Sequence, residues 1–178
     1  HHPELIIVEL LDEKGNLVPP GQPGEITVTT LGVEGMPLLR YRTGDMAHIL
    51  DDKCICGRST VRIGPVLGRK QQMIKLKGTT LYPSGIFEIL NHVEFVKDYV
   101  VEALTGDLET DEIRLHIYAE EDRVQETALA LQSAFQSRLR VVAEFNFLSG
   151  KEIEWLQFEN GSRKARKFVD RRSDYTSA

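Results

Sequence analysis

The chain has 178 residues, of which 41% are hydrophobic and 28% are charged, and its formal net charge is −5. This composition excludes a disordered protein, and the length fits one large domain or two small ones. The longest apolar run near the start, residues 5–11, contains Glu9 and is too short to cross a bilayer. It also lacks the basic flank of a secretion signal, so we expect a cytoplasmic protein without a membrane partner.

The first third of the chain has the pattern of short strands separated by glycine, proline and other turn residues. The expected strands cover residues 5–11, 25–31, 38–42 and 47–50. Strands of this length and spacing predict a small antiparallel β subdomain, similar to an open barrel. Between the last two strands, Gly44 and Asp45 are expected to form a tight turn.

The composition then changes at residues 63–69, where two glycines and a proline indicate a domain boundary. We therefore expect one domain over residues 1–67 and another over 68–178. The expected elements beyond the boundary are strands at 72–77, 98–104, 112–119 and 143–148, and helices at 84–93 and 124–142. The second helix has the clearest apolar stripe, formed by Val124, Ala128, Leu131, Phe135, Leu139 and Val142. The second half is thus predicted to be an α+β domain of about three strands and two helices.

Positive charge gathers near the C-terminus. Residues 163–172 contain six of the 22 basic residues and one of the 27 acidic residues. A nucleic-acid-binding protein usually spreads its positive charge over a face, so this cluster needs a local explanation. We expect no nucleic-acid partner, although binding through the basic cluster stays open as an alternative.

Several segments of the chain together carry a resemblance to a known family. In chain order they are Gly24-Glu25, Met36-Pro37-Leu38-Leu39-Arg40-Tyr41-Arg42-Thr43-Gly44-Asp45, Cys54-Ile55-Cys56-Gly57-Arg58, Gly68-Arg69, residues 73–78, Tyr82-Pro83-Ser84 and residues 164–170. Their order and spacing resemble the adenylate-forming superfamily and, within it, the phenylacetate–coenzyme A ligases. The match covers the C-terminal part of the family's polypeptide. It implies the last subdomain of the large adenylation domain followed by a mobile lid, a fragment that should be inactive alone.

The resemblance implies an ATP-dependent aryl-acid:CoA ligase. Such an enzyme forms an acyl-adenylate and pyrophosphate, and then an acyl-CoA thioester and AMP. ATP, coenzyme A and an aryl carboxylic acid are therefore the implied small-molecule partners. The ligand of the implied magnesium ion and the pocket that selects the acid would lie upstream, so the acid is not named. A non-catalytic nucleotide-sensing or protein-interaction module of the same fold is the alternative.

The resemblance also implies the residues that bind ATP and coenzyme A. Asp45 would hold the ribose, because an ionised carboxylate can accept hydrogen bonds from both hydroxyls, and Arg69 would reach the same ribose. Gln71 stands at the hinge, where the family commonly has aspartate or sometimes lysine, so a hinge salt bridge is in doubt. Gly78 would line the pantetheine tunnel. The simpler alternatives are a turn at Asp45, a solvated Arg69 and a strand-ending Gly78.

Lys164 is the implied catalytic residue, because a cation there would stabilise the negative charge that develops during adenylation. The family has Gly-Lys-Ala at this point, whereas the chain has Arg163-Lys164-Ala165. This departure leaves Arg163 and Lys167 open as competitors, and a solvated basic tail remains the plain alternative.

Cys54 and Cys56 are the two cysteines of the chain. A disulfide across one intervening residue would be strained. The resemblance implies half of a structural zinc site, which needs four ligands, with His1 or His2 as a further ligand if native and His48 as a poorer one. Two thiols without metal stay open.

Overall fold

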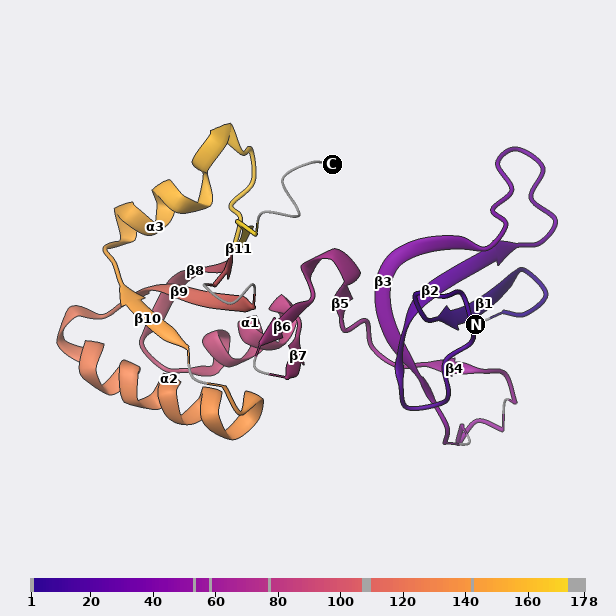
Figure 1. Ribbon diagram of the computed structural model, residues 1–178, viewed down its shortest axis with the longest axis horizontal. Helices are drawn as coiled ribbons and strands as arrows, with labels where there is room; N and C mark the ends of the chain where they lie inside the picture. The colour runs from indigo at the N-terminus through magenta and orange to yellow at the C-terminus, as the bar shows by residue number, and fades with distance from the viewer. Residues whose placement is uncertain are drawn as a thin grey trace. The chain divides into compact units, whose positions relative to one another are not determined.

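The computed structural model describes residues 2–52, 54–57, 59–76, 78–106, 110–141 and 143–172, and the side chain of residue 160 is not described (Figure 1). The chain divides into two compact units, His1–Gln71 (unit 1) and Gln72–Ala178 (unit 2). This division lies a few residues beyond the boundary expected after residue 67, because Gly68 and Arg69 pair with a strand of unit 1. The assignment of the two units to functional domains stays a prediction.

Unit 1 is a small antiparallel sheet. Its strands are β1 (Ile6–Leu11), β2 (Pro23–Thr30), β3 (Tyr41–Leu50), β4 (Arg62–Ile63) and β5 (Gly68–Arg69). They follow the order β1-β2-β3-β4, and β5 pairs with β3 beside this path. Every pairing is antiparallel, so the predicted β subdomain is confirmed.

The prediction of a tight turn at Gly44 and Asp45 is wrong. The structure has one continuous strand, β3, where the sequence suggested two. Gly44 adopts a left-handed φ of 78°, and the pairing of β2 with β3 shifts register between Glu25 and Thr27. A glycine at positive φ lets a strand bulge without reversing its direction. Asp45 therefore lies within the sheet, beside the short strand β5.

Unit 2 is a mixed sheet with helices on both faces. A 3₁₀ turn, η1 (Lys70–Gln72), precedes it. Its strands are β6 (Ile74–Leu76), β7 (Thr79–Leu81), β8 (Val96–Thr105), β9 (Asp111–Ala119), β10 (Glu144–Phe147) and β11 (Phe168–Asp170). Its helices are α1 (Pro83–His92), α2 (Val124–Leu139) and α3 (Gly150–Gln157), with 3₁₀ turns η2 (Glu121–Arg123) and η3 (Glu159–Gly161).

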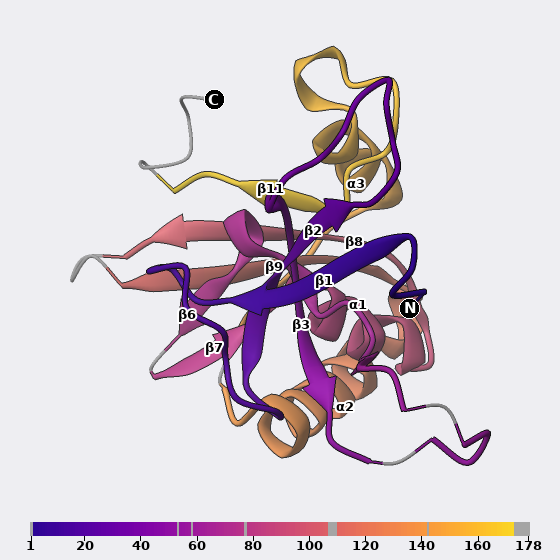
Figure 2. The same ribbon diagram turned by 90° about the vertical axis from the view of Figure 1, so that its right-hand side faces the viewer.

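The main sheet of unit 2 has the order β10-β9-β8-β11. Strands β8 and β9 are antiparallel, whereas β10 runs parallel to β9 and β11 runs parallel to β8. Helices α2 and α3 lie on opposite sides of this sheet in both ribbon views (Figures 1 and 2). Strands β6 and β7 form a separate hairpin.

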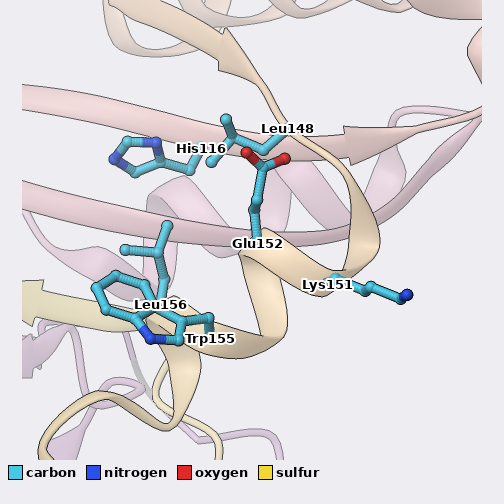
Figure 3. Close-up of a pocket in the computed structure, with 6 residues that line it drawn as sticks. All are labelled: His116, Leu148, Lys151, Glu152, Trp155 and Leu156. Carbon is cyan, nitrogen blue, oxygen red and sulfur yellow. The ribbon is translucent and has the colours of Figure 1, made fainter.

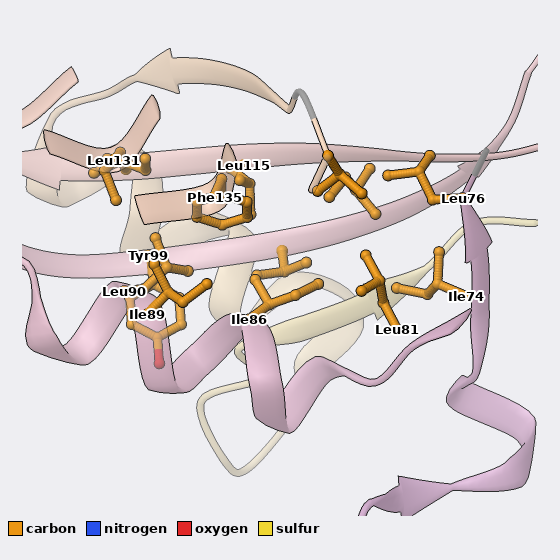
Figure 4. Close-up of a cluster of buried hydrophobic side chains, with 14 of the residues drawn as sticks. Ile74, Leu76, Leu81, Ile86, Ile89, Leu90, Tyr99, Leu115, Leu131 and Phe135 are labelled. Carbon is orange, nitrogen blue, oxygen red and sulfur yellow. The ribbon is translucent and has the colours of Figure 1, made fainter. Parts of the chain in front are cut away.

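The two faces of the sheet have separate cores. On one face, α1 and α2 pack against β8 and β9 through a large cluster that includes Leu90, Leu115 and Phe135 (Figure 4). On the other face, Ile153 of α3 packs with Val100 and Val169. Successive side chains of a strand point to opposite faces, so β8 contributes to both cores. Among the described residues, no helix is long and apolar enough to cross a membrane.

The α+β class of unit 2 is confirmed, but the expected number of elements is too low. The described residues form a four-stranded sheet, a hairpin and three helices, because β7, β11 and α3 add to the predicted set. Helix α2 is confirmed with Leu131 and Phe135 fully buried, while Val142 of its expected stripe lies outside the described residues. The strand expected from residue 72 begins at Ile74, after η1, and ends at Leu76, before a residue that is not described.

Candidate functional site

Asp45 and Arg69 meet at the end of unit 1. They are direct partners in the register of β3 and β5, and the Arg69 Nε atom lies 2.9 Å from the Asp45 Oδ1 atom. The Asp45 side chain is half-buried, whereas that of Arg69 is mostly exposed. A guanidinium and a carboxylate in this arrangement offer both hydrogen-bond donors and acceptors to a polar ligand.

Thr43 braces the strand next to this pair. Its hydroxyl donates to the carbonyl of Ile26 at 2.9 Å and accepts from the N–H of Asp45 at 3.1 Å. The carbonyl of Thr43 also accepts a long hydrogen bond from Arg69 Nη1 at 3.4 Å. The bulge at Gly44 is therefore held on both sides, which orients the Asp45 carboxylate toward Arg69.

A buried carboxylate, Glu25, supports the same end of unit 1. It accepts from Arg42 Nε at 2.8 Å and from Lys70 Nζ at 3.3 Å. Burial alone would raise the pKa of Glu25, but the hydrogen bonds from Arg42 and Lys70 outweigh it and hold that pKa below its ordinary value. Lys70 directly follows Arg69, so Glu25 anchors the strand end that carries Arg69. Glu25 belongs to one of the motifs that carry the family resemblance, but the sequence alone predicted no role for it.

Gln71 and Gly78 lie on either side of β6. Gln71 is in η1, at the division between the two units. Gly78 has a left-handed φ of 83° in the turn between β6 and β7. No described atom lies within 4 Å of the position that a Cβ on Gly78 would take, so the backbone conformation, not close packing, requires glycine here.

Lys164 lies in an exposed segment between η3 and β11. The Ser162 hydroxyl donates to the Lys164 carbonyl at 2.6 Å and accepts from the Lys164 N–H at 3.4 Å. This local pair of contacts holds the backbone around Lys164, which is exposed. In the part of the chain that the structure describes, the ammonium of Lys164 forms no ion pair.

Most other basic residues of the C-terminal cluster have partners within unit 2. Lys167 Nζ lies 3.5 Å from Asp98 Oδ1 and 4.3 Å from the centre of the Tyr99 ring. Arg171 and Arg172 form ion pairs with carboxylates, and Arg166 donates to a backbone carbonyl. Lys167 is therefore a weaker competitor for the role expected of Lys164, while Arg163 stays open. Binding of nucleic acid through the basic cluster stays an untested alternative. Fewer of its basic side chains are available for it, because Lys167, Arg171 and Arg172 already pair with carboxylates.

The two cysteine thiols do not form a complete metal site. Cys54 Sγ and Cys56 Sγ lie 2.9 Å apart, and neither belongs to a disulfide. His1 lies outside the described residues, and His2 contacts a neighbouring glutamate. Neither His48 nor any other described residue joins the thiols in a group of three or more metal-binding side chains. Two thiols do not satisfy a structural zinc ion, so the half site stays a prediction.

A pocket of about 350 Å³ lies between α3 and the sheet of unit 2. His116 and Leu148 face Trp155 and Leu156 across it, while Lys151 extends away from them (Figure 3). Both ring nitrogens of His116 already have hydrogen-bond partners in the fold. We assign no ligand to this pocket.

Comparison with known proteins supports a family relationship. No family model matches the chain. The chain is 30% identical over 173 residues to the phenylacetate-coenzyme A ligase of Aromatoleum evansii, an alignment that covers 92% of this chain and 38% of that protein. It is 38% identical over 112 residues to the phenylacetate-coenzyme A ligase of Thermus thermophilus, covering 61% of this chain and 25% of that protein.

The chain is a relative of the C-terminal portion of phenylacetate–coenzyme A ligases. It spans about a quarter to two fifths of the length of these two relatives. The resemblance expected from the sequence is thereby confirmed.

Solved structures show the same fold. A 2-hydroxyisobutyryl-CoA ligase in the postadenylation state, in complex with an acyl-AMP, aligns with a TM-score of 0.70 and 24% identity over 94% of this chain and 36% of its own. The o-succinylbenzoate CoA synthetase of Bacillus subtilis in complex with its acyl-adenylate intermediate aligns with a TM-score of 0.60 and 18% identity, over 80% of this chain and 30% of its own. At these identities the likeness establishes the fold alone.

Proposed function

We propose that this chain is the C-terminal portion of an ATP-dependent acid:CoA ligase that acts on an aryl acid of the phenylacetate type. The observation that carries the proposal is the sequence match along 92% of the chain to a phenylacetate-coenzyme A ligase. Unit 1 would be the last part of the large domain, and unit 2 would be the lid. The complete polypeptide would join the acid carboxylate to the α-phosphate of ATP with loss of pyrophosphate. The CoA sulfur would then displace AMP to form the thioester.

The ion pair of Asp45 and Arg69 is the proposed contact to the ribose of ATP. A carboxylate that already accepts one guanidinium N–H still has lone pairs for two ribose hydroxyls. Arg69 would add a donor and a positive charge beside the nucleotide. The 2.9 Å contact between them supports this proposal, because both groups lie on adjacent strands and would reach one ligand together.

Lys164 is the proposed cation of the adenylation step. Attack of a carboxylate on a phosphate brings two anions together, and a positive charge at that point stabilises the transition state. Support comes from its exposed segment and from the partners that occupy Lys167. Lysine is suited to the role because its charge is compact and its stem is flexible.

Gln71 is the proposed hinge between adenylation and thioester formation, and Gly78 the proposed contact to the pantetheine arm. The division of the two units next to Gln71 supports the hinge, since hinge residues are commonly a few positions at the end of an element. A neutral glutamine supplies no charge to favour either lid position.

Acid-dependent ATP–pyrophosphate exchange would test the proposed function. The complete polypeptide that contains this chain is supplied with phenylacetate and related aryl acids one at a time. We expect exchange with one aryl acid and formation of its thioester when coenzyme A is added. Absence of exchange with every acid, from folded protein that binds ATP, would instead favour the nucleotide-sensing module.

A further inference from the structure

The segment that carries Lys164 is tied to the fold at both of its ends. We call residues 158–167 the Lys164 loop. Near its start, the carbonyl of Glu159 accepts a hydrogen bond from Arg166 Nη2 at 2.8 Å. Near its end, the N–H of Arg166 donates to the carbonyl of Gln157 at 3.1 Å. The two ends of the loop are therefore joined across its base, with Lys164 between them.

Arg171 connects this loop to the sheet. Its Nη2 atom donates to Glu159 Oε2 at 2.7 Å, and its Nε atom donates to Glu102 Oε1 at 2.6 Å. The backbone N–H of Arg171 also donates to the carbonyl of Ala103 at 2.9 Å, which extends the pairing of β11 with β8. One guanidinium thus links a carboxylate of the loop to a carboxylate of the central strand. Charge-assisted contacts of this length are the stronger kind of hydrogen bond.

Glu102 is held from its other side by His116, and Asn146 in turn contacts His116. Its Oε2 atom lies 2.8 Å from His116 Nε2, and Asn146 Nδ2 lies 3.3 Å from His116 Nδ1. Glu102 is only 5% exposed and lies on the face of the sheet that α3 covers. The hydrogen bond from His116 and the guanidinium of Arg171 outweigh the effect of burial and lower the pKa of Glu102 to about 2. The carboxylate is therefore charged at neutral pH.

We infer that the chain of contacts His116–Glu102–Arg171–Glu159 is a positioning device for Lys164. This inference rests on the proposed function, in which Lys164 acts in adenylation. None of the four residues needs to touch the reacting groups. They fix the base of the Lys164 loop against the sheet. Because the loop is already ordered, less of the free energy of substrate binding is needed to hold Lys164 in place in the transition state. Four elements of unit 2 supply these residues: β8, β9, the end of β11 and η3.

Glu159 is the residue of this positioning device whose substitution should disturb the rest of unit 2 least. Its side chain is on the loop side of Arg171, and we expect Arg171 to keep its separate contact with Glu102 when the Glu159 charge is removed. Glu159→Gln should therefore loosen the loop without leaving a buried charge unpaired. Glu144→Gln is a matched control, since it removes a carboxylate from an exposed ion pair with Arg114 in the same sheet, away from the loop.

The first test measures the loop in this 178-residue chain. Amide hydrogen exchange is followed at Arg166, whose N–H closes the base of the loop. We expect exchange about 10-fold faster in Glu159→Gln, with the exchange of core strand amides unchanged, and no change at Arg166 in Glu144→Gln. Equal exchange at Arg166 in wild type and Glu159→Gln would overturn the inference, whatever the activity of the complete enzyme.

The second test measures each half-reaction in the complete polypeptide. Glu159→Gln should slow pyrophosphate exchange about 10-fold, less than the roughly 10²-fold that an ångström of misplacement can cost. Formation of the thioester from preformed acyl-adenylate should stay within about twofold of wild type, because Lys164 has no proposed role in that step.

A double-mutant cycle separates positioning from general stability. In a Lys164→Ala background, Glu159→Gln should cause no further loss of pyrophosphate exchange, because residues that act through one another are not additive. A loss of the same size in both backgrounds would overturn the inference. If Lys164→Ala alone leaves exchange unchanged, the proposed role of Lys164 fails. If Lys164→Ala slows pyrophosphate exchange and Glu159→Gln does not, the positioning device is rejected while the proposed role of Lys164 stands.

Discussion

Asp45 and Arg69 form an ion pair across β3 and β5, with 2.9 Å between Arg69 Nε and Asp45 Oδ1. The bulge at Gly44 makes this pairing possible, because it keeps Asp45 within the strand that β5 joins. This pair is the contact that we propose for the ribose of ATP.

Asp45→Asn should weaken ATP binding in the complete enzyme. The amide keeps the shape of the side chain but loses the charge and part of the capacity to accept hydrogen bonds. We expect the KM for ATP in pyrophosphate exchange to rise about 10-fold, which corresponds to ~1.4 kcal/mol. Asp52→Asn serves as a control, since its carboxylate is exposed and forms a long 3.9 Å contact with Arg62. Equal KM values for the two variants would contradict the assignment of Asp45.

Lys164→Ala should separate the two half-reactions. Loss of one stabilising cation is expected to slow adenylation by roughly 10²–10³, by analogy with the removal of one oxyanion-hole donor. Thioester formation from preformed acyl-adenylate should survive. Arg163→Ala, the neighbouring exposed cation, is the matched variant and should retain most of the exchange activity. If Arg163→Ala slows adenylation and Lys164→Ala does not, the catalytic role belongs to Arg163.

Glu102→Gln should change how the stability of this chain depends on pH. Because the pKa of Glu102 is lowered from 4.5 to about 2 on folding, its charge stabilises the folded state above pH 4.5, and this contribution is lost as the pH falls toward 2. Near neutral pH the substitution should destabilise unit 2 by on the order of 3 kcal/mol, because it breaks a buried pair. Thermal unfolding from pH 2 to 7 measures both effects. If the difference in unfolding temperature between wild type and Glu102→Gln does not shrink below pH 4.5, this explanation is wrong.

Gly44→Ala should destabilise unit 1 through its backbone alone. A Cβ at this position would lie 3.7 Å from Arg69 Nη1, an ordinary contact distance, but the left-handed φ of 78° disfavours alanine. We expect a loss of about 1–2 kcal/mol in the free energy of unfolding. Gly35→Ala should change it by less than about 0.5 kcal/mol, because Gly35 has no positive φ and no described neighbour within 4 Å of its Cβ position. Chemical denaturation of both variants provides the comparison.

Local sequence patterns predicted the elements that depend on local chemistry. The apolar stripe predicted α2, and two runs of strand-forming residues predicted β8 and β9, each close to its observed position. Helix α3 was not among the predicted elements, although its start carries a local signal. Ser149 and Glu152 form a capping box, in which Ser149 Oγ accepts from the Glu152 N–H and the Glu152 carboxylate accepts from the Ser149 N–H.

By itself the sequence determined the α+β class, the antiparallel character of unit 1 and the family resemblance, because periodicity, turn residues and motif spacing are local properties of the chain. Only the tertiary structure decided which carboxylates Lys167, Arg171 and Arg172 of the basic cluster meet. Arg171 reaches Glu102, 69 positions away along the chain, because β11 pairs in parallel with β8. Lys167 reaches Asp98 for the same reason. Such partners depend on which strands become neighbours in the sheet, and no local pattern encodes that choice.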